Sequence, residues 1–170
     1  YAIRENNTCV FLAADFDGAG WKEDVIAYRD VARELGIEVA IERSRSGDGG
    51  HAWIFFSEPV SALMARRLGT LIVAKASSLH PAMALSSYDR FFPNQDALPA
   101  GGFGNLIALP LQAKPRELGN SLFLDEDLVP FPDQWAYLAT LSRVSPNQLD
   151  EFVEQTVIQA SDAPVSYTHL

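Results

Sequence analysis

The stretch Cys9-Val-Phe-Leu-Ala-Ala-Asp-Phe-Asp17 joins an apolar run to two acidic residues. Apolar residues over this length predict a buried strand, which Gly18-Ala-Gly20 ends. Residues two apart on a strand point to the same face, so Asp15 and Asp17 are expected to project together. Adjacent carboxylates repel each other, and a divalent cation with oxygen ligands, Mg²⁺ or Mn²⁺, is the usual compensation. The alternative is a solvated pair of acids at a turn; the apolar run before them favours a metal site.

Helices and strands alternate after this first strand. The apolar spacing from Trp21 to Leu35 predicts a helix, and Gly36 is placed to cap it. Strands over 39–44 and 52–56 are expected to form a hairpin, and a second helix is predicted to begin at Ser57. The remaining expected elements are strands over 84–90, 105–109 and 121–124 and helices from Pro132 and from Ser145. This order predicts an α/β (α+β) sheet of the ferredoxin-like or RNA-recognition-motif-like type.

Composition restricts the class of protein. The 170 residues are 48% hydrophobic and 21% charged, which suits a globular domain and excludes a disordered tail, a fibrous repeat and a disulfide scaffold. The single cysteine, Cys9, cannot form an internal disulfide and favours a reducing, cytoplasmic compartment. No apolar run approaches the length of a membrane span, so no membrane partner is expected. Because no methionine precedes Tyr1, we expect a fragment of a longer protein.

Negative charge is concentrated in the C-terminal third. The net charge is -9, and residues 117–162 carry nine of the 22 acidic residues with Arg143 as their only base. Acidic proteins do not normally bind nucleic acid, but the remaining two thirds are nearly balanced in charge. Contact with a nucleic acid would therefore require a local basic face within residues 1–116.

The glycine-rich stretch Arg43-Ser-Arg-Ser-Gly-Asp-Gly-Gly-His51 is a second unusual feature. Glycines allow backbone N–H groups to turn inward and bind an anion, and serine hydroxyls and arginines strengthen such a site. The stretch is not a Walker P-loop, because no Gly-Lys-Ser/Thr follows. A flexible hairpin tip with a structural histidine is the alternative. We predict that Arg43, Ser44, Ser46, Gly47, Gly50 and His51 form a site for a triphosphate or a DNA phosphate.

A third group of polar residues lies in Tyr88-Asp-Arg-Phe-Phe-Pro-Asn-Gln-Asp96 and at Asn105. Asp89 is the predicted third metal ligand, and Asp96 is the alternative. Buried polar groups need partners, which a nucleotide or a template strand could provide. Asparagines and glutamines that only cap the loop backbone are the other possibility. The predicted template contacts are Arg45, Arg90, Asn94, Gln95 and Asn105.

Taken together, the three blocks resemble the catalytic motifs of archaeo-eukaryotic primases, and in particular the primase-polymerase domain of TOTE conflict systems. The resemblance covers about residues 1–140 and rests on Leu12–Asp17, Glu42–Phe56, Asp89–Gln95 and Gly104–Pro110. It implies an RNA-recognition-motif-like catalytic sheet with flanking helices, spanning 1–143. Residues 144–164 would then form a C-terminal helix that begins a linker or the next region, and 165–170 a non-native tail.

The resemblance also implies a chemistry. It implies template-directed nucleotidyl transfer, in which nucleoside triphosphates are added to a primer on single-stranded DNA or primer-template. Asp15, Asp17 and Asp89 would hold two Mg²⁺ or Mn²⁺ ions, and His51 would be a further catalytic residue at the triphosphate. Helicase and endonuclease domains are expected as fused or associated partners outside this fragment.

Two other functions are compatible with parts of the sequence. One is a catalytically inactive nucleic-acid-binding module of the same fold, against which the intact acidic pair argues. The other is a haloacid-dehalogenase-type phosphatase, because Asp15-Phe-Asp-Gly18 resembles the nucleophile motif of that family. In this chain Ala19 follows the glycine, and no acidic pair ends a later apolar strand.

Overall fold

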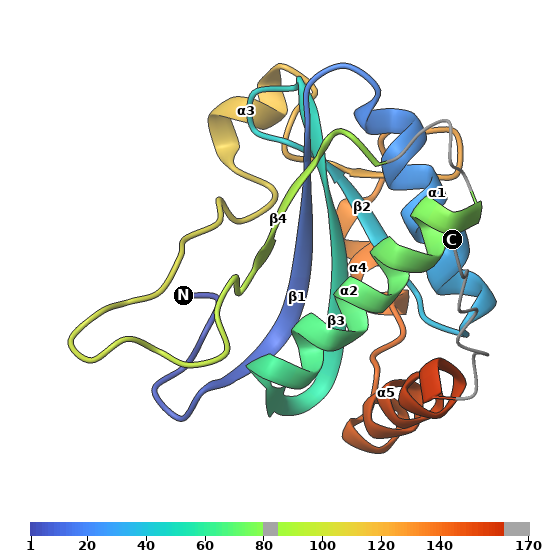
Figure 1. The fold of residues 1–170 in the computed structure, drawn as a ribbon. Coiled ribbons are helices and arrows are strands. Elements are labelled where there is room, and N and C mark those ends of the chain that lie inside the picture. The colour runs from blue at the N-terminus through green and yellow to red at the C-terminus, as the bar shows by residue number, and fades with distance from the viewer. Residues whose placement is uncertain (80–84, 162–170) are drawn as a thin grey trace, which may run out of the picture.

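A five-stranded antiparallel sheet forms the centre of the molecule (Figure 1). The computed structural model describes residues 1–79 and 85–161, with side chains as far as Glu154. The strands are β1 (Thr8–Asp17), β2 (Ala40–Arg43), β3 (Gly49–Ser61), β4 (Tyr88–Phe92) and β5 (Phe123–Leu124). Their order across the sheet is β4-β1-β3-β2-β5, so β1 lies between β4 and β3. This sheet with its flanking helices confirms the predicted fold class.

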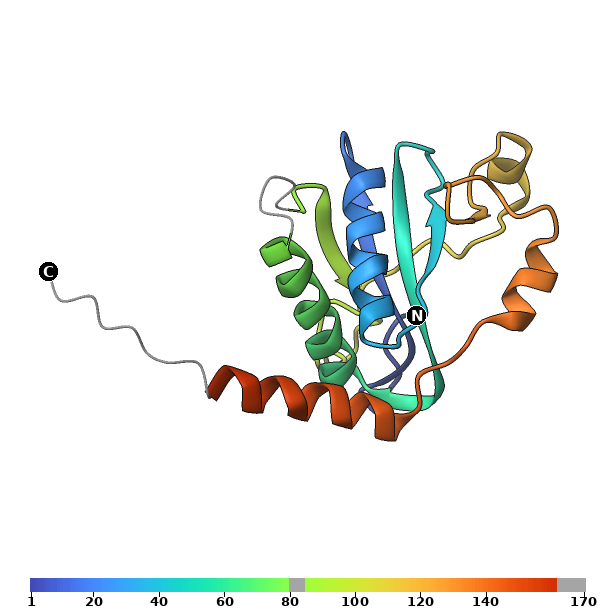
Figure 2. The same ribbon diagram turned by 90° about the vertical axis from the view of Figure 1, so that its right-hand side faces the viewer.

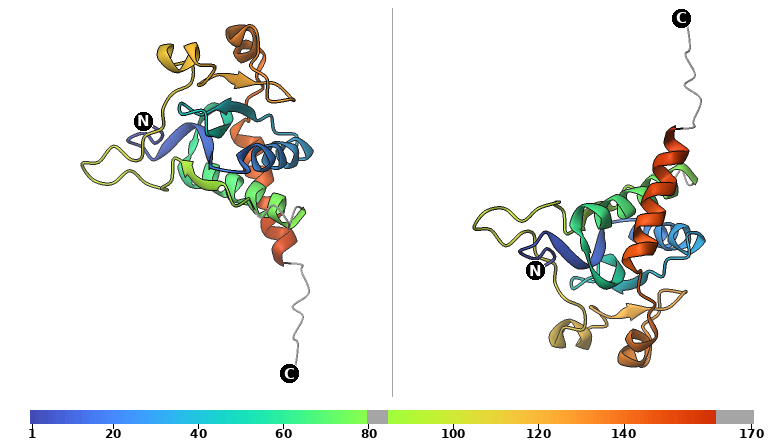
Figure 3. Two further views of the ribbon diagram at one scale, coloured as in Figure 1. Left: turned by 90° about the horizontal axis from the view of Figure 1, so that it is seen from above. Right: turned by 90° about the horizontal axis from the view of Figure 1, so that it is seen from below.

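Helices α1 (Trp21–Glu34) and α2 (Ala62–Leu79) cover one face of the sheet (Figure 2). Alternate residues of β1 and β3 meet both helices in the main core, which includes the fully buried Phe16, Tyr28, Ile54 and Leu68. Helix α5 (Pro146–Ser161) lies next to α2 at one end of the molecule (Figure 3). The predicted helix from Trp21, the predicted helix from Ser145 and the β2–β3 hairpin are confirmed.

The opposite face of the sheet, called the outer face below, is only partly covered. Ala13, Trp53 and Phe92 project onto it and form a second, smaller core with Phe123. Segment 105–111 and helix α4 (Gln134–Thr140) contribute the residues that pack on this core. A short helix, α3 (Ala113–Glu117), connects segment 105–111 to β5, and α4 follows β5 along the chain. Toward the C-terminal end of β1, apolar residues on the outer face give way to acidic and polar ones.

The predicted start of the second helix is wrong. Residues 57–61 belong to β3, and α2 begins at Ala62. The end of β3 pairs back onto β1, with Ser61 opposite Thr8 and Val60 opposite Cys9. The register shifts between Cys9 and Phe11, and such an irregularity leaves room for Pro59, which cannot donate a ladder hydrogen bond. Long-range pairing has therefore overridden the local helix signal.

Other expected elements differ in position. Residues 105–109 form no strand. They are an irregular segment that packs on the smaller core through Ile107. The strand expected over 84–90 is β4 at Tyr88–Phe92, and the strand expected over 121–124 is shorter. Helix α4 begins two residues after Pro132, and Asp133 caps it by accepting from the Trp135 and Ala136 N–H groups. The tail predicted at 165–170 lies outside the described residues. Within the described part of the chain, no helix has the length and apolar character needed to cross a membrane.

Candidate active site

Three carboxylates converge at the end of β1 on the outer face. Asp15 and Asp17 end β1, and Asp89 comes from the neighbouring strand β4. One carboxylate oxygen from each lies within 4.8 Å of the others, and this is the only group of three or more potential metal-ligating acids, histidines or cysteines that the described residues contain. The sequence-predicted trio is thus brought together.

An irregularity in strand pairing explains how Asp89 reaches this cluster. Asp15 is opposite Arg90, but the next residue, Phe16, is opposite Tyr88, so Asp89 has no partner of its own. An extra residue of this kind bends a strand and redirects its side chains. Asp96, the alternative third ligand, lies in the following loop and forms an ion pair with Arg66 of α2.

A buried carboxylate outside the cluster ties β4 to α1. Asp24, in the first turn of α1, is 3% exposed and accepts hydrogen bonds from Ser87 N–H at 3.0 Å and Ser87 Oγ at 2.7 Å. The Ser87 carbonyl accepts in turn from the Asp17 N–H at 2.8 Å. This chain of contacts fixes the start of β4 against the end of β1. Asp24 was not singled out from the sequence, where it is indistinguishable from other acids of a helix's first turn.

His51 lies directly across from Asp15 on β3, as the pairing register requires. Its Nε2 is 3.4 Å from Asp15 Oδ1, and its Nδ1 donates to Glu42 Oε2 at 2.8 Å. Burial lowers the pKa of His51, but hydrogen bonds to Asp15 and Glu42, together with their charges, raise it to about 9. The imidazole is therefore protonated on both nitrogens at neutral pH, and its Nε2–H is a donor at the edge of the acid cluster.

The charges within the cluster are only partly balanced. Burial and the neighbouring Asp15 carboxylate raise the pKa of Asp17 above its usual range. Arg90 is exposed and donates from Nε to Asp89 Oδ2 at 2.6 Å. Three close carboxylates with one arginine and one histidine leave excess negative charge. Their hard oxygen ligands fit Mg²⁺ or Mn²⁺.

The glycine-rich loop lies between β2 and β3. It reaches the end of β1, where the Asp48 carbonyl accepts from the Gly18 N–H at 3.2 Å. Gly47 has a φ of +90°, a conformation that side chains rarely adopt. A Cβ on Gly50 would lie 2.5 Å from the Trp21 ring, so this position tolerates no side chain. Ser44 Oγ and Ser46 Oγ are 3.1 Å apart, and Ser46 Oγ accepts from the Asp48 N–H at 3.3 Å.

Arg43 lies apart from the other predicted loop contacts. It is opposite Gly50, one residue away from the Glu42–His51 pair, so strand alternation directs its side chain toward the helix side. Its Nε is buried and has no hydrogen-bond partner among the described residues. Arg45 is exposed in the loop.

The predicted template contacts in the following loop have local backbone partners. Asn105 accepts from the Asn94 N–H at 3.2 Å and donates to the Phe91 carbonyl at 3.1 Å. Gln95 donates to the Ala97 carbonyl at 3.2 Å. These contacts hold the loop against the end of β4, as the backbone-capping alternative expected.

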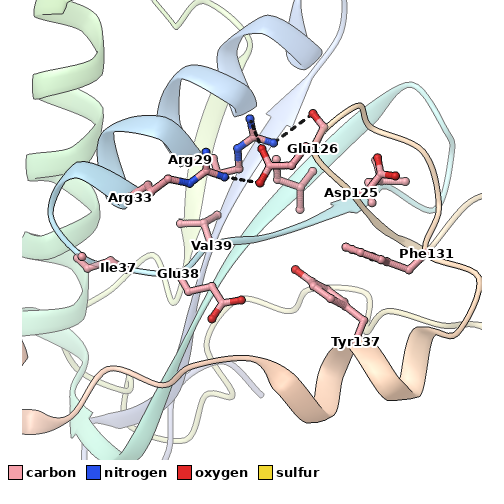
Figure 4. A pocket seen from close by; sticks show the side chains of 12 residues that line it. Arg29, Arg33, Ile37, Glu38, Val39, Asp125, Glu126, Phe131 and Tyr137 are labelled. Atoms are coloured by element: carbon pink, nitrogen blue, oxygen red, sulfur yellow. Dashed lines mark hydrogen bonds and ion pairs between the residues drawn. The ribbon is translucent and has the colours of Figure 1, made fainter.

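A pocket of about 490 Å³ lies at the β2–β5 edge of the sheet, away from the acid cluster (Figure 4). Arg29 and Arg33 line one side, and both are paired with Glu126. Phe131 and Tyr137 stack on the other side with ring centroids 3.9 Å apart. Because Asp30 pairs with both arginines as well, two carboxylates balance their charge, and neither arginine is a free cation for a phosphate.

Comparison with known proteins identifies the family. The structure is similar to the "Polymerase Domain from Mycobacterium tuberculosis Ligase D in complex with DNA", with 19% sequence identity and a TM-score of 0.41. The match covers 92% of this chain and 57% of that one, so the chain spans less than two thirds of its length. No curated protein matches the chain. The family model for the archaeo-eukaryotic primase domain of TOTE conflict systems matches residues 1–152, and with its three convergent carboxylates the chain belongs to that family.

Proposed function

We propose that this domain catalyses template-directed nucleotidyl transfer from nucleoside triphosphates by a two-metal mechanism. The carrying observation is the convergence of Asp15, Asp17 and Asp89 within 4.8 Å in a chain of the primase family. That membership supports nucleotidyl transfer as the reaction class. It also removes the basis for a phosphatase, whose motif would have used Asp15 as a covalent nucleophile.

Asp15, Asp17 and Asp89 would hold two Mg²⁺ or Mn²⁺ ions. Such ions, when bound, activate a primer hydroxyl and neutralise charge on the triphosphate and the departing pyrophosphate. The carboxylates fix where those ions can lie, because strand pairing and the Asp24–Ser87 contact hold their backbones. Arg90 pairs with Asp89 and, if a bound cation replaced it as the partner of that carboxylate, would be free to contact a phosphate group.

The chain's own donors would bind the triphosphate beside these carboxylates. His51 directs Nε2 toward the cluster, and Ser44 and Ser46 lie in the adjoining loop with Gly47 and Gly50. Of the predicted triphosphate ligands, Arg43 is the one whose side chain strand alternation directs to the opposite face of the sheet. Arrays of donors aimed at phosphate oxygens stabilise the charge that develops in phosphoryl transfer.

The template would be single-stranded DNA or a primer-template held by phosphate contacts. Arg45 in the glycine-rich loop and Arg90 beside Asp89 are exposed and supply positive charge. Asn94, Gln95 and Asn105 would contribute through the loop that they stabilise. Contacts to phosphates position a strand without reading its sequence. We further propose that helicase and endonuclease domains act with this domain in the cytoplasm.

A primer-extension assay tests the proposal. The wild-type chain, a labelled primer-template and nucleoside triphosphates are incubated with Mg²⁺ or Mn²⁺, and chain lengthening is measured with and without chelator. Asp89→Asn is expected to reduce extension by orders of magnitude. Asp96→Asn is the matched control, because it also neutralises an acid close to β4, and it should extend normally. Equal activity of wild type and Asp89→Asn would contradict the proposed site.

A further inference from the structure

A buried glutamate lies behind His51, in the row of residues that crosses the sheet. Asp15 on β1, His51 on β3 and Glu42 on β2 are direct neighbours in the pairing register. All three therefore project onto the outer face. Glu42 is 1% exposed, whereas Asp15 retains contact with solvent at the cluster.

Three donors surround the Glu42 carboxylate. Oε2 accepts from His51 Nδ1 at 2.8 Å and from Trp53 Nε1 at 2.9 Å. Oε1 accepts from Ser121 Oγ at 3.2 Å. A buried carboxylate is costly unless it is fully hydrogen-bonded, and these donors supply that compensation from β3 and from the residues just before β5.

This arrangement determines what His51 can offer to a ligand. Because Nδ1 donates to Glu42, the orientation of the ring is fixed, and Nε2 is the nitrogen left to face the cluster. Without Glu42 the imidazole could rotate about its side-chain bonds or bind through the other nitrogen. The side chain would then lose the orientation that aims its donor at a phosphate oxygen.

We propose that Glu42 is a positioning residue for nucleoside triphosphate binding, acting through His51. This inference rests on the proposed function, since the ligand of His51 is the triphosphate of that reaction. Glu42 itself touches no substrate. Its contribution passes through the single hydrogen bond to Nδ1, while the bonds to Trp53 and Ser121 hold the carboxylate in place.

The test compares two changes of Glu42 with one change of a residue that donates to it. Glu42→Met removes all its hydrogen bonds while keeping side-chain length. Glu42→Gln keeps an acceptor toward His51 and Trp53 and turns its amide toward Ser121, whose hydroxyl can accept. Ser121→Ala is the matched control, because it removes one hydrogen bond from the same carboxylate and leaves the His51 bond intact. Each is made in the wild-type and in the His51→Ala background.

Three measurements are taken on the full chain. The first is the KM and kcat for nucleoside triphosphates in primer extension. The second is calorimetric titration with ATP and with dATP in the presence of Mg²⁺. The third is the NMR signal of the His51 ring N–H that bonds to Glu42, assigned by its loss in His51→Ala.

We expect Glu42→Met to raise the KM at least ten-fold, with a smaller change in kcat, and to add nothing in the His51→Ala background. Glu42→Gln and Ser121→Ala should stay within three-fold of wild type and keep the ring N–H signal. Equal losses from Glu42→Met in both backgrounds would overturn the proposal, because Glu42 would then act independently of His51. A ten-fold higher KM in folded Glu42→Gln, with the ring N–H signal retained, would also overturn the proposal. This second criterion does not need Glu42→Met, so it applies even if that variant fails to fold.

Failure of the proposed function gives a different result. The wild type would then extend no primer, while the ring N–H signal and the dependence of ATP or dATP binding on Glu42 through His51 would remain. Loss of that dependence in an actively extending enzyme would overturn the positioning role alone.

Discussion

Replacing Asp17 with asparagine should raise stability in chelator and lower primer-extension activity. Its carboxylate lies within 4.8 Å of oxygens from Asp15 and Asp89, and burial and the Asp15 charge raise its pKa. Asp17→Asn removes the repulsion with little change in volume. At that separation, the Coulomb energy of one such pair is about 1 kcal/mol in water and about 3 kcal/mol at an effective dielectric constant of 20.

The exposure of Asp17 favours the lower of these values. The substitution also loses attraction to His51 and Arg90, which offsets part of the gain. We therefore expect Asp17→Asn to raise the free energy of unfolding in chelator by roughly 0.5–1 kcal/mol. In the wild type, Mn²⁺ should stabilise the fold, because an ion that binds only the folded state shifts the equilibrium. In the variant that gain should be largely lost.

Urea denaturation with and without Mn²⁺ measures both quantities, and primer extension is measured on the same preparations. The matched control is Asp48→Asn, which neutralises an exposed acid of the glycine-rich loop. It should leave the metal-dependent gain unchanged. The metal-site assignment would be refuted by a variant that is less stable in chelator and still gains the full wild-type stabilisation from Mn²⁺.

Three further outcomes are expected. Asp24→Ala should lower the free energy of unfolding by about 2–3 kcal/mol in urea denaturation, because it leaves the buried N–H and hydroxyl of Ser87 unpaired, whereas the exposed neighbour change Glu23→Ala should cost less than about 0.5 kcal/mol. The raised pKa of His51 adds stability that is fully present below pH 6.5 and is lost as pH rises through about 9. In chelator, the free energy of unfolding of the wild type should therefore fall by as much as about 3 kcal/mol over this window, and that of His51→Gln by much less. Binding of labelled single-stranded DNA should have a log–log salt slope of about -2 to -3, as for three or four phosphate contacts, and a slope near zero would argue against the basic face.

Sequence reasoning predicted the parts of the site that depend on local pattern. The apolar run before Asp15 predicted β1, and two-residue periodicity predicted that Asp17 would join it on one face. The glycine-rich stretch predicted the β2–β3 hairpin, whose register places His51 opposite Glu42, whereas the position of His51 opposite Asp15 comes from the separate pairing of β1 with β3. In each case the signal lies within one stretch of about ten residues.

The remaining parts depend on pairing between distant segments. Whether Asp89 or Asp96 completes the cluster is decided by where β4 pairs irregularly with β1, and nothing within 88–96 determines that register. The strand ending of β3 was missed for the same reason, since Ser61 is held by Thr8. A local helix signal cannot show that a partner strand lies beside it.

Glu42 shows why a buried and fully hydrogen-bonded carboxylate is hard to recognise in a sequence. In the stretch Ile41-Glu42-Arg43 it looks like one half of a surface charge pair at a strand end. Its three donors come from residues 9, 11 and 79 positions away, so only the folded sheet reveals that it is satisfied and buried. Its neighbour Arg43 was assigned to the triphosphate from the same pattern, yet strand alternation directs that side chain to the other face. Adjacent residues on a strand point to opposite faces of the sheet. Glu42, and not Arg43, is therefore the residue connected to the acid cluster, through its hydrogen bond to His51.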